Sequence, residues 1–431
     1  MSDSLTKGIG HTEFKNSPMG KIPVDWEIVL GSKNLTLGSG FSPSLVEFSD
    51  NGNCLFMKVD DYNNSENLRF IIVTKLSFNK FENKKIPIYS KGTIVIAKRG
   101  AAIFKNRVKI FSRETSVDTN LMTIQTGENF NTVFFRYYLE YFNLEKIADT
   151  TSIPQINNFH LYDMAFPKPP IHEQQKIAKI LTSVDEVIEA TETQINKLKD
   201  LKKGMMNELL TKGIGHTEFK DSAVGRIPVE WEVKEFQEVS NVIDSLHQTP
   251  VFSSTGFPMV RVSDIKQGKI KLEYTQKVKE DVFLQFTKKY LPVLGDLLIS
   301  RVGSYGVCSI VDTEQQFCLG QNTAIIHPTT VLSKFLYYWI YSPSIFEQVE
   351  NEVAGSSYKS LSLATIRKLN IAIPSKLEQE KIANIIWSID TNIEQKQTKL
   401  TQSKNLKKSL MADLLTGKVR VKPNQELTEL S

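Results

Sequence analysis

Two long stretches of the chain carry apolar residues at helical spacing, and the first runs from His172 to Leu210. It contains no proline, and its single glycine is Gly204. Apolar residues recur every three or four positions, as in an amphipathic helix. They are Ile177, Ile180, Leu181, Val184, Val187, Ile188, Ile195, Leu198, Leu201, Met205 and Leu209. About 39 residues at ~1.5 Å each would form a helix of ~58 Å, which needs a partner to cover its apolar stripe.

The second stretch repeats the first near the end of the chain. Its opening, LEQEKIANII (Leu377–Ile386), matches HEQQKIAKIL (His172–Leu181) at an offset of 205 residues. The stripe then continues through Ile389, Ile393, Leu400, Leu406, Leu410 and Leu414. Lys396 and Ser403 occupy stripe positions, so we expect weaker packing there and a better-defined register. Because a whole domain separates the two helices, we expect them to pack antiparallel on each other as a coiled-coil spacer.

The segment before each long helix has a strand-like pattern. Short runs rich in β-branched residues predict strands at Ile86–Tyr89, Thr93–Ala97 and Leu121–Ile124. One aromatic helix is predicted at Asn131–Tyr141, and Lys334–Tyr341 holds the same place in the second half. We interpret both aromatic stripes as core rather than base-stacking surface. The predicted fold class is therefore α+β: two strand-rich α/β domains joined by two long antiparallel helices, with an internal pseudo-twofold duplication.

A further repeat marks where each strand-rich domain begins. Thr6–Ile28 and Thr211–Val233 are identical at 17 of 23 positions and lie 205 residues apart. A repeat of this size indicates a duplicated domain, since the repeating unit of a solenoid is ~20–50 residues long. The predicted organisation is a junction segment at 1–20, a first domain at 21–168, a first spacer helix at 169–212, a second junction and domain at 213–373, a second spacer helix at 374–418 and a polar tail at 419–431.

Composition and charge narrow the class of protein. The net charge is +5, which is compatible with a polyanion partner. No apolar run approaches the ~18–20 residues that cross a bilayer, and MSDSLTKGIG lacks the pattern of a signal peptide. The three cysteines, Cys54, Cys308 and Cys318, lack metal-ligand spacing, which favours buried free thiols in a reducing compartment. We therefore expect a cytoplasmic protein that does not contact a membrane.

The first domain carries a basic run, KRGAAIFKNRVKIFSR, from Lys98 to Arg113. It contains six cations and no acid, with Phe104 and Phe111 between them. Such a run suits phosphate contacts and arginine reading of guanine. The alternative is a solvated strand–turn–strand whose lysines keep a sheet edge from pairing. The candidate DNA-binding residues of this domain are Lys98, Arg99, Lys105, Arg107 and Lys109.

The second domain shares only its scaffold with the first. GTIVIAKRGAA (Gly92–Ala102) matches GDLLISRVGSY (Gly295–Tyr305), so each predicted strand ends in a cation followed by a glycine. The residues between such anchors differ, as expected if each domain reads something different. A glycine-lined turn lets a backbone approach a groove closely. The candidates for DNA binding here are Arg301, Ser304 and Tyr305.

Searches for catalytic chemistry return nothing specific. The sequence lacks a GxxxxGK phosphate loop, an HExxH helix, a CxxC pair and a GxSxG elbow. Glu13 to Lys15 and Glu218 to Lys220 resemble the Glu-x-Lys half of a nuclease site. That half needs an upstream aspartate on a neighbouring strand, and the second copy has none nearby. His11 and His216 have no second ligand, which argues against zinc. We expect no catalytic or metal site in this chain.

The repeated motifs together resemble a known family. GHTEFKDSxxGxIPxEW, GDLLISRxG, PxxxEQxKIAxIL and LLTG are similar to those of the DNA-specificity subunit of type I restriction–modification systems. The match covers nearly the whole chain, and each main motif occurs twice. One departure is Lys98, which stands where the second copy has Arg301 and puts the role of that cation in doubt.

The resemblance implies a non-catalytic subunit that binds a bipartite, asymmetric sequence of double-stranded DNA through two target-recognition domains. The paired helices would space the domains and dock two methyltransferase subunits, with restriction/translocase subunits joining the complex. S-adenosylmethionine, ATP and Mg would then belong to the partners. We interpret the near-identical junctions as two equivalent seats for the methyltransferase subunits, using His11, Glu13 and Lys15 and their repeats His216, Glu218 and Lys220.

Two other functions fit parts of the pattern. A DNA-recognition subunit of a type II bifunctional restriction–modification enzyme would share the architecture, and a coiled-coil adaptor would need no DNA. Half-sites on one face of B-DNA lie about one turn, ~34 Å, apart. A helix pair of ~58 Å is long enough to set that spacing.

Overall fold

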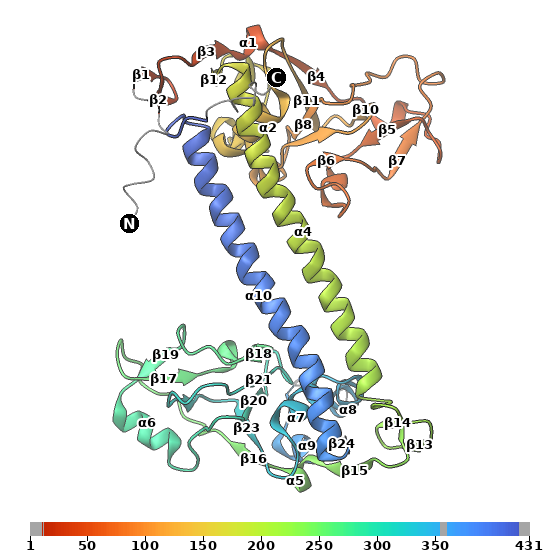
Figure 1. The fold of residues 1–431 in the computed structure, drawn as a ribbon, viewed down its shortest axis with the longest axis vertical. Coiled ribbons are helices and arrows are strands. Elements are labelled where there is room, and N and C mark those ends of the chain that lie inside the picture. Colours follow the sequence, from red (N-terminus) through yellow and green to blue (C-terminus); the bar gives the residue numbers. More distant parts are fainter. Residues whose placement is uncertain (1–10, 12, 354–359, 422–431) are drawn as a thin grey trace, which may run out of the picture. The chain divides into compact units, whose positions relative to one another are not determined.

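The computed structural model describes residues 11, 13–353 and 360–421. The predicted segments 1–20 and 419–431 thus lie partly outside the described residues. The chain forms two compact units, one of residues 1–193 and 398–431 and the other of 194–397. Helices α4 (Ile171–Leu209) and α10 (Lys376–Leu414) are 39 residues long each, and both run from one unit into the other (Figure 1). Their lengths agree with the predicted helical stretches.

Each unit contains a five-stranded sheet with the same strand order. In the first unit the order is β4 (Leu35–Ser39), β11 (Leu121–Thr126), β8 (Ile94–Ala97), β9 (Lys109–Phe111) and β6 (Phe70–Ile71). In the second unit it is β16 (Ser240–Asp244), β23 (Thr323–Pro328), β20 (Leu297–Ser300), β21 (Cys308–Ile310) and β18 (Gly268–Lys269). In both sheets the last strand pairs parallel and the other pairs are antiparallel.

A three-stranded sheet and two small pairs also occur in each unit. The three-stranded sheets are β10 (Thr115–Val117), β5 (Cys54–Met57), β7 (Leu76–Phe78) and β22 (Cys318–Leu319), β17 (Phe257–Val260), β19 (Gln276–Val278). The pairs beside the long helices are β3 (Glu27–Leu30) with β12 (Ala165–Lys168) and β15 (Glu232–Glu235) with β24 (Asn370–Ile373). The matching topologies confirm the predicted duplication of an α+β domain.

Shorter helices complete each domain. In the first they are α1 (Gly31–Asn34), η1 (Pro43–Leu45), η2 (Val59–Asn63), η3 (Ile103–Lys105), α2 (Thr132–Phe142), η4 (Leu144–Ile147) and α3 (Asn158–Tyr162). In the second they are α5 (Phe236–Val239), η5 (Val262–Asp264), α6 (Glu280–Thr287), α7 (Ser333–Ile340), α8 (Pro343–Val353) and α9 (Leu363–Lys368).

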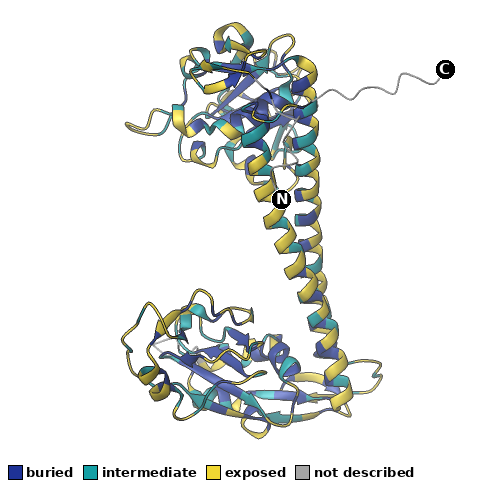
Figure 2. Ribbon diagram, turned by 60° about the vertical axis from the view of Figure 1, so that its left-hand side comes forward, coloured by how far each residue is buried: buried dark blue, intermediate teal, exposed yellow. Residues whose placement is uncertain are grey.

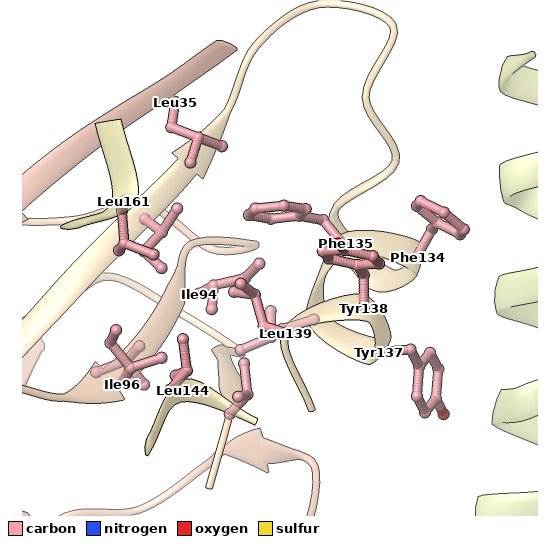
Figure 3. Close-up of a cluster of buried hydrophobic side chains, with 14 of the residues drawn as sticks. Leu35, Ile94, Ile96, Phe134, Phe135, Tyr137, Tyr138, Leu139, Leu144 and Leu161 are labelled. Carbon is pink, nitrogen blue, oxygen red and sulfur yellow. The ribbon is translucent and has the colours of Figure 1, made fainter. Parts of the chain in front are cut away.

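The aromatic helices are core, as predicted. In α2, Phe134, Phe135, Tyr137 and Leu139 have no exposed surface, because the helix lies between the five-stranded sheet and α4. Figure 3 shows Phe134 and Tyr137 on the side of α2 that faces the long helix. In the second unit, α7 is buried in the same way over Phe335–Ile340.

One predicted strand is wrong. Ile86–Tyr89 is a loop in which only Tyr89 forms a bridge, to Thr115. Pro87 has no N–H for a ladder, and the buried Asn83 side chain holds the preceding turn by donating to the carbonyls of Glu47 and Asn79.

The two long helices run antiparallel within each unit, as predicted. In the first unit, Ile177 and Leu181 near the start of α4 share a core with Met411 and Leu414 near the end of α10. In the second unit, the ends exchange roles: the core there joins Met206 and Leu209 to Ile382 and Ile386.

The apolar stripe is less continuous than the sequence suggests. Leu201 and Leu406, both predicted to lie in the stripe, are half exposed, whereas Ile188, Ile195 and Ile393 are buried. Much of the remaining surface of both helices is exposed (Figure 2). Polar contacts between the helices add to the apolar ones: Lys396 donates to Gln194 Oε1 at 2.7 Å in the second unit. In the first unit, Lys404 Nζ lies 2.7 Å from Glu192 Oε1.

Candidate nucleic-acid interface

The junction ahead of the first domain is tied to the start of the long helix. His11 Nε2 lies 3.1 Å from Glu173 Oε1, and Trp26 Nε1 donates to Glu173 Oε2 at 3.0 Å. The His11 ring also packs edge-on against Trp26, at 5.8 Å between centroids. Because Glu173 is the third residue of α4, its carboxylate also interacts favourably with the positive end of the helix dipole.

The second junction repeats this arrangement. His216 Nε2 lies 2.9 Å from Glu378 Oε1, and Trp231 Nε1 donates to Glu378 Oε2 at 3.1 Å. We call each set the His–Glu–Trp clamp: His11, Glu173 and Trp26, and His216, Glu378 and Trp231. The two clamps explain why histidine, tryptophan and the helix-start glutamate recur together at an offset of 205 residues.

The next residue of each long helix holds the aromatic helix. The buried Gln174 side chain accepts from Asn131 N at 2.7 Å and donates to the Pro169 carbonyl at 2.7 Å. Gln379 accepts from Leu332 N at 3.0 Å and donates to the Pro374 carbonyl at 2.9 Å. We call Glu173 with Gln174, and Glu378 with Gln379, the EQ pairs. Each EQ pair thus connects the start of a long helix to both the junction and the domain core.

These contacts change the role we assign to the junction histidines. His11 is only 8% exposed and its ring faces residues of its own chain, so a partner subunit has little access to it. His216 is half-buried in the equivalent clamp. Glu13, Glu218 and Lys220 are exposed, and Lys15 donates to the Val24 carbonyl. The carboxylates and Lys220 are therefore the accessible part of the predicted docking set.

Each junction contains a β-hairpin. β1 (Phe14–Ser17) pairs with β2 (Gly20–Pro23), and β13 (Phe219–Ser222) pairs with β14 (Gly225–Pro228). Gly20 and Gly225 adopt φ values of 100° and 96°, which only glycine takes without strain. In each Glu-x-Lys stretch the glutamate directly precedes the first strand of the hairpin, and the lysine lies on that strand.

A second repeated cluster joins each domain to both helices. In the first unit, the buried Asp185 accepts from Tyr137 Oη at 2.7 Å and from Lys407 Nζ at 2.9 Å. In the second unit, Asp390 accepts from Tyr338 Oη at 2.8 Å and from Lys202 Nζ at 2.7 Å. We call these the Tyr–Asp–Lys latches. In each latch the tyrosine comes from the aromatic helix, the aspartate from one long helix and the lysine from the other.

Burial alone would raise the pKa of Asp185. The adjacent Lys407 ammonium and the Tyr137 hydroxyl outweigh that effect, and the pKa lies below its usual value of 3.8. The carboxylate is therefore held in its charged form inside the unit, where it keeps the domain and both helices together.

The basic run does not form one cationic surface. Lys109 lies on β9, is 7% exposed, and donates to the carbonyls of Tyr62 and Asn67. Burial, with the nearby Arg107 and Arg136, lowers the pKa of Lys109 to about 8. The prediction that Lys109 contacts DNA is thus corrected, because its ammonium points into the domain rather than toward solvent.

The other cations of the run divide by exposure. Arg107 is half-buried and donates to the Tyr62 carbonyl at 3.0 Å and to Asn63 Oδ1 at 2.8 Å. Lys98 is half-buried, and burial lowers its pKa. Arg99 and Lys105 are exposed, and the Phe104 ring beside Lys105 is also open to solvent. Arg99 and Lys105 are therefore the strongest remaining candidates in the first domain.

The equivalent turn of the second domain is built in the same way. The backbone N–H of Lys98 donates to the Asn120 carbonyl, and that of Arg301 donates to the Asn322 carbonyl. Gly100 and Gly303 follow with φ values of 77° and 66°. The alignment of Lys98 with Arg301 therefore holds in three dimensions, although their side chains differ in use.

Two of the three candidates in the second domain have partners within the chain. Arg301 donates to Asp244 Oδ1 at 2.7 Å and to the Leu361 carbonyl at 3.1 Å. Tyr305 donates to Glu350 Oε1 at 2.9 Å. Ser304 is exposed at the tip of the turn. Arg301 thus shapes this turn, while Ser304 is free to contact a ligand.

The sequence analysis did not single out Tyr274, an exposed aromatic residue of the second domain. Tyr274 is 86% exposed between the exposed Lys271 and Lys277, on the segment that leads into β19. An exposed ring among lysines is a suitable surface for nucleic acid. The lysine spacing was visible in the sequence, but the exposure of the ring depends on the fold.

Within the described ranges, no group of three or more His, Cys, Asp or Glu side chains is placed to hold a metal ion. Over the same residues, no helix combines the length and apolar character needed to span a membrane.

A family model describes both halves of the chain. The model for the type I restriction modification DNA specificity domain matches residues 23–200 and again 228–403, which is most of the sequence. The chain belongs to this family. Family membership makes it a DNA-recognition specificity subunit of a type I system, as predicted, and favours neither a type II enzyme nor a coiled-coil adaptor.

Two relatives are distant in sequence but match over nearly their full lengths. The MjaVIII specificity subunit of Methanocaldococcus jannaschii is 26% identical over 422 residues, covering 95% of this chain and 96% of the relative. The putative MjaX specificity subunit of the same organism is 28% identical over 430 residues, covering 95% and 97%.

A solved structure supports the fold. The S subunit of a type I restriction–modification system from M. genitalium superposes with a TM-score of 0.60 at 15% identity, covering 94% of this chain and 98% of that chain. At this identity the likeness supports the architecture of two domains joined by long helices, and no assignment of individual residues.

Proposed function

We propose that this specificity subunit recognises a bipartite, asymmetric sequence in double-stranded DNA, each domain reading one half. The observation that carries the proposal is the pair of domains with one strand order and different surfaces. Exposed groups at the equivalent turns differ in kind: Arg99 and Lys105 in the first domain, Ser304 in the second. Two different surfaces on one scaffold suit two unrelated half-sites.

The chain is proposed to contribute recognition and no catalytic group. Arg301, Lys109 and the junction histidines are occupied by partners within the chain, so they serve the fold rather than a reaction. S-adenosylmethionine, ATP and Mg would then be bound by the methyltransferase and restriction/translocase subunits. A cytoplasmic location, where such a complex meets DNA, stays a prediction.

Two methyltransferase subunits are proposed to dock on the two equivalent junctions. Glu13 and Glu218 support this, because each is exposed directly before the first strand of its hairpin. Replacing both by lysine should weaken co-purification with the methyltransferase subunit without unfolding either domain. A matched control is Glu82→Lys, an exposed carboxylate on the first domain. Equal assembly by the double variant and the control would contradict docking at the junctions.

Methylation mapping tests the main proposal. The chain would be co-expressed with its methyltransferase subunit in a host without other methylation, and modified bases mapped genome-wide by single-molecule sequencing. We expect one motif made of two short specific blocks separated by unspecified bases. Methylation at a single continuous motif, or without sequence preference, would overturn the proposal.

A further inference from the structure

The second unit contains a groove of about 750 Å³ between its recognition domain and the long helices. Five lysines line the groove, and two carboxylates, Asp390 and Glu394, lie among them. The lysines are Lys199, Lys202 and Lys203 of α4, and Lys269 and Lys271 on and beyond β18. Cations therefore face each other across the groove from two different elements.

Three of these lysines are available to a ligand. Lys202 is held by Asp390 in the latch, and Lys269 lies 2.7 Å from Asp312. Lys199, Lys203 and Lys271 are exposed. Lys199 and Lys203 lie four residues apart, so they share one face of α4. The groove thus presents a line of ammonium groups with Lys271 opposite.

The inner wall of the groove is aromatic. Trp387 lies beneath two cations, with Lys334 Nζ 4.5 Å and Lys269 Nζ 5.5 Å from its ring centroid. Phe346 also lines the groove and is 70% exposed. A ligand that pairs anionic groups with flat, weakly polar faces would match this lining.

The equivalent surface of the first unit is different. Thr391 and Gln397 of the groove correspond, at an offset of 205, to Glu186 and Glu192. On this surface of the first unit, Arg69 donates to both carboxylate oxygens of Glu189, at 2.8 and 3.0 Å. Lys404, the counterpart of Lys199, pairs with Glu192. The repeat has therefore kept the lysines of the helix but replaced the opposing surface.

We propose that one sugar–phosphate backbone of the bound DNA crosses this groove in the second unit. Lysine ammonium groups bind phosphate oxygens as point charges, and deoxyribose faces can rest on the aromatic wall. The proposal rests on the proposed DNA-recognition function and adds a contact that is independent of sequence. It also makes the two halves of the molecule unequal in how firmly they hold phosphate.

The test is the salt dependence of DNA binding by the assembled methyltransferase complex. The triple variant Lys199→Gln, Lys203→Gln, Lys271→Gln should reduce the slope of log affinity against log salt by about 2–3, since each lost phosphate contact removes about 0.9. The methylated motif should not change, because phosphate contacts carry no base information. The corresponding arginine variants should keep the slope.

Matched variants in the first unit provide the control. Lys404→Gln with Lys408→Gln changes the counterparts of Lys199 and Lys203 and should leave the slope unchanged. An unchanged slope in the groove variant, or an equal loss in the control, would overturn the proposal. Loss of complex assembly by the groove variant alone would also overturn it and indicate a protein partner. Failure of the unaltered complex to recognise a bipartite motif would instead overturn the proposed function.

Discussion

At the scale of residues, the side chains that recur in both halves stabilise the fold more than they provide ligand-binding groups. Glu173 is the clearest case, since one buried carboxylate satisfies His11 and Trp26 at once. The repetition of all three residues was visible in the sequence. Their contact was not, because His11 and Glu173 are 162 positions apart and meet only when the helix start folds onto the junction.

Replacing Glu173 by alanine should lower the free energy of unfolding by about 2–4 kcal/mol, because two buried polar groups lose their partner. Glu378→Ala should have a similar effect in the second unit. Denaturant unfolding would measure both. Glu208→Ala is the control, since its exposed carboxylate pairs with the exposed Lys212. A change no larger than that of the control would contradict a supporting role for the clamp.

Lys109 provides a residue-scale test of burial. Its pKa in the folded chain is about 8, below the usual 10.5. The unfolded chain therefore binds more protons between these values, and stability from this group should rise as pH increases from 8 to 10.5. Lys109→Met should remove that rise, measured as the difference between the two unfolding free energies across the pH range. If the unfolding free energies of the two proteins changed equally with pH, the Lys109 ammonium would not be buried.

At the scale of elements, both the Tyr–Asp–Lys latches and the apolar stripe hold the long helices together. The apolar stripe predicted two long paired helices, and they are present with 39 residues each. The stripe did not reveal that Leu201 and Leu406 are exposed. Polar groups such as Lys396 and Gln194 also contact each other between the helices, which hydrophobic periodicity does not predict.

The latch of the first unit should make the free energy of unfolding depend on pH in the acidic range. Because the pKa of Asp185 is lowered in the folded chain, its contribution is fully present above the unfolded value of ~3.9 and is lost as pH falls below it. Asp185→Asn should cost about 3–5 kcal/mol at pH 7, as expected when a buried ion pair loses one partner. The difference from the unaltered protein should shrink toward pH 3. A difference independent of pH would contradict the charged latch.

The length of the helices should set the spacing between half-sites. Inserting seven residues into both helices at the contact of Gln194 with Lys396 adds two turns, or ~10.5 Å. The unspecified part of the methylated motif should lengthen by about three base pairs, with both specific blocks kept. Methylome mapping would detect this. An unchanged spacer in a complex that still assembles would show that the helices do not act as a ruler.

At the scale of the whole molecule, the duplication allows the domains to change independently of their scaffold. Each domain meets its helices through the same EQ pair and latch, while its loops differ. Replacing residues 30–165 by the recognition domain of another family member should change one half of the methylated motif only. Changes in both halves would show that the domains do not read DNA separately.

The sequence by itself determined the duplication, the two long helices, the aromatic cores and the family. These features follow from periodicity and repetition, which are local or directly comparable along the chain. Only the tertiary structure decided which cations face solvent, why the junction motif is repeated, and where the basic groove lies. Lys109 and Lys199 are both lysines near other lysines in sequence, yet one ends inside a domain and the other beside a groove. The difference arises from burial and from partners distant in sequence, which no local pattern encodes.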